Sequence, residues 1–258
     1  MPEIHSTALV SEEAQLADDV VVGPYAIIDG PSIIGSGCNI GPRATISGRV
    51  VMGTNNTIGP GTIIGGPPQD LSYDPAIESG VIIGDNNKTF EYVTIHRAAT
   101  EGGNTVIGNS NFLMTGSHFA HDCKVGNENV VANNALFAGH VTVGNKTVIG
   151  GGAVFHQFIR IGDYVMAQGN CAVGKDAPPF CTVYRINRLM GLNIVGLRRA
   201  GFTAEERKEI KSAYVALFQT NLSRPEAVAL AESKITHGPG LLLIDAVKNP
   251  SSKGSLSR

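Results

Sequence analysis

The sequence carries little charge, few aromatic side chains and no tryptophan. Asp, Glu, Lys and Arg make up 16% of the 258 residues, against roughly 25% in an ordinary soluble domain. The net charge is −2, so the chain has no general attraction to nucleic acid or to anionic lipid. We therefore expect no nucleic-acid partner.

The chain also lacks the features of exported and membrane-spanning proteins. Its four cysteines have neither paired nor metal-binding spacing, which favours a reduced compartment. The N-terminus has no basic segment followed by an apolar core. No apolar run approaches the roughly 20 residues of a membrane span. We expect a cytoplasmic protein with no signal peptide and no membrane span.

Glycine is abundant, with 32 residues, and apolar residues recur at every sixth position. One run of this pattern extends from Ile4 to Ile64, and a second from Ile83 to Val173, with only Thr89 and Glu101 polar. Glycine follows many of the apolar positions directly. A period of six matches neither the 3.6 of a helix nor the 2 of a simple strand.

This period fits a parallel β-solenoid, in which one short strand and one turn use six residues. Three such sides give a triangular coil of 18 residues, with the apolar residue inward and the adjacent glycine taking the backbone angles of the corner. The pattern resembles the hexapeptide repeat of the left-handed β-helix acyltransferases. The left hand is implied by that resemblance, because parallel crossovers generally favour the other hand.

Two interruptions break the coil, and its C-terminal part changes character. Residues 66–80 are rich in Pro and Gly and coincide with a phase slip, so they are predicted to form a loop that leaves the coil. Residues 97–104 form the second interruption. Capping boxes at Thr203 and Ser223 predict helices reaching about Gln219 and Thr236, and a third helix is expected over 241–248. We assign 1–185 to the β-helix and 186–258 to a small α-helical domain with a frayed tail.

Five of the seven histidines lie between residues 96 and 156, and the 18-residue period arranges several of them in a column. His121 is predicted to stack against Gly139, and Gly139 against Gln157, while Asp122 stacks against His140, with coils about 4.8 Å apart. None of these histidines falls on the inward phase. Since histidine transfers protons near neutral pH, the column is a candidate catalytic site.

The same residues allow two other kinds of chemistry, a metal site and a covalent nucleophile. Three histidines, His118, His121 and His140, could form a site like that of the trimeric γ-type carbonic anhydrases, but the spacing of that family is missing, so no metal and no cofactor are predicted. Cys123 follows His121 and Asp122 but has no separate set of orienting residues, which is more typical of an inert thiol.

Six short motifs occur in order along the chain and carry a resemblance to one family. They are QDL at 69–71, TIHR at 94–97, HxxHD at 118–122, AGH at 138–140, HQF at 156–158 and RxGF at 199–202. Together with the helical C-terminus, they make the chain similar to the UDP-N-acetylglucosamine O-acyltransferases of lipid A biosynthesis. That family transfers an (R)-3-hydroxyacyl group from acyl carrier protein to the 3-position of the sugar and acts as a homotrimer.

The resemblance implies roles for individual residues. His121 would be the general base, Asp122 would orient it, and the backbone N–H of Gly139 would stabilise the oxyanion. The remaining matched positions would bind substrate: Gln69, Asp70, His96, His118, His140, His156, Gln157, Gly169, Asn193 and Arg199. Gly169 matches the position that limits acyl length, and as glycine it implies a chain of about twelve to fourteen carbons.

Several positions depart from the pattern of the family, and they fall on expected nucleotide and sugar contacts. Ser72 replaces a lysine, Val195 replaces a glutamate, Ala200 replaces an arginine, and 184–186 replace a Gly-Asn segment. The acceptor could therefore be a UDP-N-acetylglucosamine hydroxyl or the amine of a 3-amino UDP-sugar. A trimeric metal-dependent lyase is the other alternative. A basic region suits an acidic carrier protein; it comprises Arg185, Arg188, Arg198, Arg199, Arg207 and Lys208.

Overall fold

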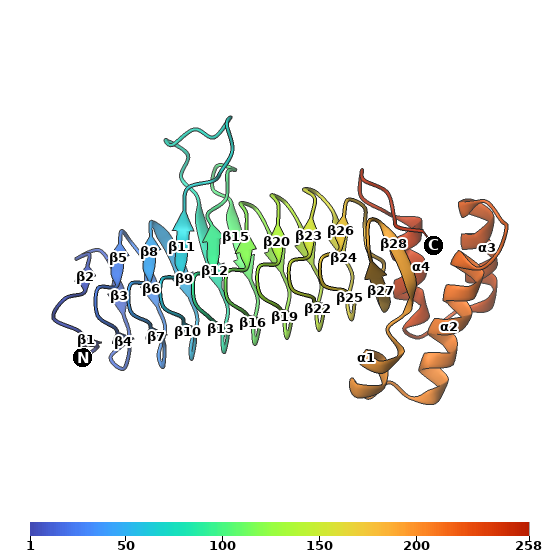
Figure 1. Cartoon of the computed structure of the whole chain (residues 1–258), viewed down its shortest axis with the longest axis horizontal. Coiled ribbons are helices and arrows are strands. Elements are labelled where there is room, and N and C mark those ends of the chain that lie inside the picture. Colours follow the sequence, from blue (N-terminus) through green and yellow to red (C-terminus); the bar gives the residue numbers. More distant parts are fainter. Residues whose placement is uncertain (258) are drawn as a thin grey trace.

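A computed structural model describes residues 1–257 and shows an elongated coil with helices at one end (Figure 1). The coil consists of very short strands in three sheets. The first sheet contains β1 (Glu3–Ile4), β4 (Val21–Val22), β7 (Asn39–Ile40), β10 (Thr57–Ile58), β13 (Lys88–Thr89), β16 (Phe112–Leu113), β19 (Val130–Val131), β22 (Val148–Ile149), β25 (Met166–Ala167), β27 (Cys181–Tyr184) and β28 (Arg188–Leu192). The second contains β2 (Leu9–Val10), β5 (Ile27–Asp29), β8 (Thr45–Ser47), β11 (Ile63–Gly66), β14 (Thr94–His96), β17 (His118–Phe119), β20 (Leu136–Phe137), β23 (Val154–Phe155) and β26 (Ala172–Val173). The third contains β3 (Gln15–Leu16), β6 (Ile33–Ile34), β9 (Arg49–Met52), β12 (Gly80–Ile83), β15 (Asn104–Ile107), β18 (Lys124–Val125), β21 (Thr142–Val143) and β24 (Arg160–Ile161).

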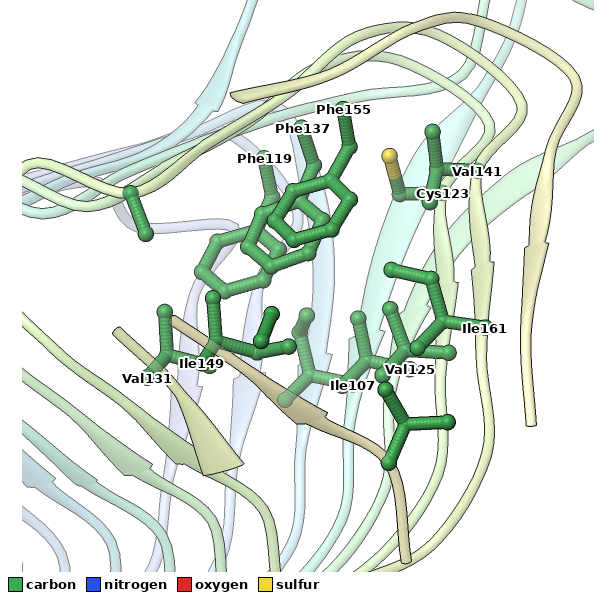
Figure 2. Packing of buried hydrophobic residues seen from close by; sticks show 14 of the residues in the cluster. Ile107, Phe119, Cys123, Val125, Val131, Phe137, Val141, Ile149, Phe155 and Ile161 are labelled. Atoms are coloured by element: carbon green, nitrogen blue, oxygen red, sulfur yellow. The ribbon is translucent and has the colours of Figure 1, made fainter. Parts of the chain in front are cut away.

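Apart from the terminal β28, the strands within each sheet pair in parallel with the register that the sequence period predicts. Phe119 pairs with Phe137, and Phe137 with Phe155, each 18 residues further along the chain. In most strands the first residue faces outward and the second is buried. The three phenylalanines stack inside the coil with ring centroids 4.9 and 4.8 Å apart (Figure 2). The inward phase of the repeat is thus the hydrophobic core.

A ladder of buried asparagines satisfies the backbone of the corners between the third and first sheets. The Asn111 Oδ1 accepts the Asn129 N–H at 3.0 Å, and the Asn111 side-chain amide donates to the Gly126 carbonyl at 2.9 Å. Asn87 and Asn56 repeat this arrangement in the preceding coils. Because a buried polar group without a partner is costly, these bonds fix the corners firmly.

The predicted conformational role of the glycines after the inward residues was wrong. Gly41 and Gly126 do not have positive φ; the left-handed residues lie two positions later, at Arg43 and Glu128. A Cβ on Gly126 would lie 2.6 Å from the Gly144 carbonyl oxygen of the next coil. These glycines are required because adjacent coils approach closely, not because the corner needs unusual backbone angles.

Two loops leave the coil at the corner between the second and third sheets. Residues 67–79 connect β11 to β12 and project furthest from it (Figure 1), and residues 97–103 connect β14 to β15. The phase slip in the sequence lies at the first loop, and the polar Glu101 in the second. The loops contact each other, since the Gly102 N–H donates to the Glu78 carbonyl at 2.8 Å.

The C-terminal part packs on the last coils. Strand β28 returns antiparallel to β27, and four helices follow: α1 (Ile194–Arg199), α2 (Ala204–Phe218), α3 (Arg224–Lys234) and α4 (Gly240–Lys248). Thr203 and Ser223 cap α2 and α3 with Glu206 and Glu226, which confirms both capping boxes. The β27–β28 hairpin and α1 were not predicted.

Up to residue 257 the tail is not frayed, contrary to the sequence prediction, and Arg258 lies outside the described residues. Leu256 is fully buried, and Ser255 pairs with Asp176 of the coil. Ser251 also donates its hydroxyl to Asp176 at 2.7 Å. The composition of the tail suggested mobility, but its few apolar and hydroxyl groups find partners on the coil.

Candidate active site

His121 and Asp122 form a hydrogen-bonded pair at the corner between β17 and β18. The His121 Nδ1 lies 2.8 Å from the Asp122 Oδ2, and only 11% of each side chain is exposed. Asp122 has a φ of 60°, a left-handed conformation that aspartate tolerates better than most residues. The corner thereby places a carboxylate beside the imidazole of the preceding residue.

Further donors hold the carboxylate of Asp122. The Ala99 N–H donates to Oδ2 at 2.9 Å, and the Thr100 hydroxyl to Oδ1 at 3.0 Å. Burial on its own raises the pKa of Asp122, but the hydrogen bonds from Ala99, His121 and Thr100, with the nearby His140, bring that pKa below its usual value. An ionised carboxylate only accepts hydrogen bonds, so the His121 Nδ1 must carry a proton. The His121 Nε2 is then free to act as a base.

Gly139 lies directly against the imidazole of His121, as the 18-residue period predicts. A Cβ on Gly139 would lie 2.6 Å from both Cε1 and Nε2 of His121. The adjacent stack is confirmed as well, since the His140 N–H donates to the His121 carbonyl at 3.0 Å and the His140 Nε2 lies 3.7 Å from Asp122. Only a residue without a side chain fits beside this base.

The backbone N–H of Gly139 takes part in no hydrogen bond within residues 1–257. The same turn position is proline at Pro24, Pro42 and Pro60, on another corner of the coil. Proline has no N–H, so the coil does not use this donor for its own structure. Next to His121, the unused N–H is available to stabilise a negative charge on a reacting molecule.

His118 lies on β17, just before the His121 corner, and His96 lies on β14, the neighbouring strand of the second sheet. The Thr94 hydroxyl and the His118 Nδ1 are 2.7 Å apart, and the ring of His96 meets that of His118 edge-on, with centroids 5.0 Å apart. Burial lowers the pKa of His118. Burial, together with the two nearby histidines, lowers the pKa of His96 to about 4. Both rings are therefore neutral near pH 7.

A groove of about 400 Å³ passes over this corner and gathers five of the predicted site residues. They are Gln69, His118, His121, Gly139 and Gln157. The outward side chains of Leu136 and Val154, which are 42% and 40% exposed, form its apolar floor. The groove thus brings together an imidazole nitrogen, an unused backbone N–H and an apolar surface.

Asp70 lies near the groove on the projecting loop, and it is paired with Ser72. The Asp70 Oδ1 accepts the Ser72 N–H at 2.8 Å and its hydroxyl at 2.7 Å. These bonds lower the pKa of Asp70, with smaller contributions from His121 and His140. The carboxylate is exposed and charged, which suits a polar substrate group.

Four other predicted residues lie outside the groove within one chain. His156 borders a neighbouring groove with Ile186 and Asn187. Gly169 lies on the corner between β25 and β26, at the opposite edge of the second sheet. Asn193 caps α1 and Arg199 ends it. Their assignment to the substrate site stays a prediction.

Sequence reasoning missed Ala99 and Thr100. Their hydrogen bonds to Asp122 come from the 97–103 loop, which interrupts the repeat, so no periodic argument could have placed them. The only signal was the break itself, with the polar Glu101 on the inward phase.

The geometry distinguishes a proton-transfer pair from two alternatives. Ligand atoms of His121, Asp122 and His140 cluster within 4.8 Å, but the 2.8 Å between Nδ1 and Oδ2 is shorter than the roughly 3.3 Å between two ligands of one tetrahedral zinc ion. Cys123 is fully buried, and burial raises its pKa to about 12. A thiol in that state is no nucleophile.

The solenoid and its His-Asp corner define an acyltransferase of the hexapeptide-repeat class. The family model described as bacterial transferase hexapeptide matches residues 13–48, 31–66 and 104–139. The model described as UDP N-acetylglucosamine O-acyltransferase, domain 2, matches residues 176–255. The two models between them cover parts of both the coil and the helical region.

Relatives match nearly the whole chain. The acyl-[acyl-carrier-protein]–UDP-N-acetylglucosamine O-acyltransferase of Thermodesulfovibrio yellowstonii is 46% identical over 244 residues, 94% of each chain. The enzyme of the same name from Sulfurihydrogenibium sp. is 52% identical over 251 residues, 96% of this chain and 92% of the relative. The crystal structure of the UDP-N-acetylglucosamine acyltransferase of Francisella novicida is 35% identical, with a TM-score of 0.95 over 99% of this chain and 94% of that one.

The chain belongs to the UDP-N-acetylglucosamine O-acyltransferase family. It is an acyltransferase, and its coil is the predicted left-handed β-helix with a small helical C-terminal part. None of the helices within residues 1–257 is both long and apolar enough to cross a membrane.

Proposed function

We propose that this enzyme transfers an (R)-3-hydroxyacyl group from acyl carrier protein to the 3-hydroxyl of UDP-N-acetylglucosamine, the first step of lipid A biosynthesis. The names of the relatives support the two substrates. The observation that carries the chemistry is the His121 Nε2 facing Gly139 while Nδ1 is held by Asp122.

The reaction follows from these three residues. The His121 Nε2 removes the proton of the sugar hydroxyl as the oxygen attacks the carbonyl carbon of the thioester. The Gly139 N–H stabilises the oxyanion of the tetrahedral intermediate. When the C–S bond breaks, the His121 imidazolium returns its proton to the departing thiolate, and an ester and a free carrier thiol result. Because the thiol of Cys123 is buried, it is not available as a nucleophile. We therefore propose that the acyl group passes directly to the sugar, without an acyl-enzyme.

The substrates are proposed to lie along the groove in opposite directions from His121. Asp70 and Gln69 suit the sugar hydroxyls, and the apolar surface of Leu136 and Val154 suits the acyl chain. With glycine at 169, we expect a chain of about twelve to fourteen carbons, as the family resemblance implies. Comparing transfer rates from acyl carrier proteins of different chain length tests this; the fastest transfer with ten carbons or fewer would contradict it.

We further propose that the enzyme acts as a cytoplasmic homotrimer with each site between two subunits. Gly169, Asn193 and Arg199 lie away from the His121 groove of their own chain, so a second subunit would have to bring them to it. The basic side chains near the C-terminal end, Arg198 and Arg207 among them, would face the acidic carrier protein.

A 3-amino UDP-sugar is the second candidate acceptor, because Ser72, Val195 and Ala200 depart from the pattern of the family at expected sugar and nucleotide contacts. Ser72 is uncharged and donates its hydroxyl to Asp70 at 2.7 Å, so it offers no positive charge to the nucleotide. An amine needs the same base and the same oxyanion donor, and it yields an amide instead of an ester.

The deciding experiment offers the purified enzyme both acceptors with the same hydroxyacyl carrier protein. We expect a higher kcat/KM with UDP-N-acetylglucosamine than with the amino sugar. The product should be an ester, which mild alkali cleaves. A faster reaction with the amino sugar and an alkali-stable product would establish the second candidate. Elemental analysis and EDTA treatment belong to the same experiment: activity that depends on bound zinc would favour the metal-dependent alternative.

A further inference from the structure

The hydrogen bonds that fix Asp122 come from a segment outside the histidine column. Oδ1 of Asp122 accepts one hydrogen bond within residues 1–257, from the Thr100 hydroxyl at 3.0 Å. Oδ2 is shared between the Ala99 N–H and His121. Both Ala99 and Thr100 belong to the 97–103 loop, so this loop sets the orientation of the carboxylate that orients the base.

The same loop is attached to the loop that carries Gln69 and Asp70. The Ser79 hydroxyl donates to the Ala98 carbonyl at 2.5 Å, and the Glu78 N–H donates to Oε2 of Glu101 at 3.2 Å. Arg97 donates through Nε to the Tyr73 hydroxyl at 3.0 Å. The 97–103 loop therefore bridges the proposed sugar-binding segment and the catalytic pair.

We propose that Thr100 is a positioning residue of the acyl transfer, acting through Asp122 on His121. This inference rests on the proposed function of His121 as the base. Thr100 is itself exposed, and its side chain adds little to the core. Its hydroxyl therefore has one evident use, the bond to the Asp122 carboxylate.

Loss of this bond has a consequence that a purely structural role would not have. With one donor fewer, the negative charge on Asp122 is less stabilised, so the His121–Asp122 pair binds a proton more readily. The base is then protonated, and inactive, at a higher pH than in the wild type. The acid limb of the kcat/KM profile must shift upward in pH, while the KM for the sugar nucleotide stays close to the wild-type value.

The test compares Thr100→Val with Thr100→Ser, which retains the hydroxyl. Hydrogen bonds to charged groups are strong, and because this one is exposed we expect the low end of their range, a loss of about tenfold in kcat. Thr54→Val is the matched control, since the Thr54 hydroxyl donates to the Asp85 carboxylate at 3.1 Å on a different corner of the coil.

The supporting result is a loss in kcat with an upward shift of the acid limb in Thr100→Val, recovery in Thr100→Ser, and wild-type behaviour in Thr54→Val. An unchanged kcat and pH profile in Thr100→Val, with its melting temperature unchanged, would overturn the inference, as would an equal loss in the control. Failure of the proposed function itself is recognised separately, because the wild-type enzyme would then transfer no acyl group.

Discussion

Adding one methyl group at Gly139 should disable the base without harming the fold. Gly139 has no positive φ, so alanine meets no backbone strain there. Its Cβ would, however, lie 2.6 Å from both Cε1 and Nε2 of His121. Both contacts are shorter than real side chains show, and one of the two groups must move.

The ring is the group that moves, because the backbone around Gly139 is held on both sides: the Ala138 N–H donates to the Phe155 carbonyl, and the Gly139 carbonyl accepts from the Phe158 N–H. Reaching an ordinary contact of about 3.4 Å requires a displacement approaching 1 Å. A misplacement of that size costs on the order of a hundredfold in rate when geometry carries the catalysis. The bond between His121 and Asp122, at 2.8 Å, lengthens or breaks as the ring moves.

Steady-state transfer from hydroxyacyl carrier protein to the sugar nucleotide measures the effect. For Gly139→Ala we expect kcat lower by about a hundredfold and a melting temperature close to that of the wild type. Gly191→Ala is the control, since a Cβ at Gly191 meets no atom within 4 Å. A Gly139→Ala enzyme with near-normal kcat would refute the close packing of base and oxyanion donor.

Two further predictions concern stability. Phe137→Ala removes the middle ring of the stack with Phe119 and Phe155 (Figure 2), so denaturant unfolding should show a loss of about 3–5 kcal/mol; a loss within experimental error would mean that the coil collapses around the gap. Burial lowers the pKa of His96 to about 4. As pH falls from about 6.5 to 4, the imidazole of His96 is therefore protonated in the unfolded chain but stays neutral in the folded chain. Stability should decline over that interval by up to roughly 3 kcal/mol, and His96→Gln should flatten the decline; an unchanged slope would show that other groups cause it.

The sequence predicted the coil and the contacts around His121 and Asp122 well, because a strict period determines which residues lie side by side in successive coils. Once 18 residues make one turn, Gly139 must lie against His121 and His140 beside Asp122, and both contacts are present. The inward phase likewise identifies the core, including the buried Phe119. No knowledge of side-chain packing was needed for these predictions.

Features outside the period could not be predicted in the same way. Thr100 reaches Asp122 only because a non-repeating loop folds back on the corner. Leu256 docks on the coil although the tail around it is polar. The role of Gly126 depends on the distance between coils, which the sequence period does not give, and was mistaken for a conformational one.

Replacing His121 tests the central claim most directly. Because we propose this imidazole as the base for the attacking hydroxyl, His121→Ala should lower kcat by about 10²–10⁴-fold at saturating substrates, with the wild-type fold and sugar-nucleotide binding retained. A His121→Ala enzyme that transfers the acyl group at a rate within tenfold of the wild type would contradict the account.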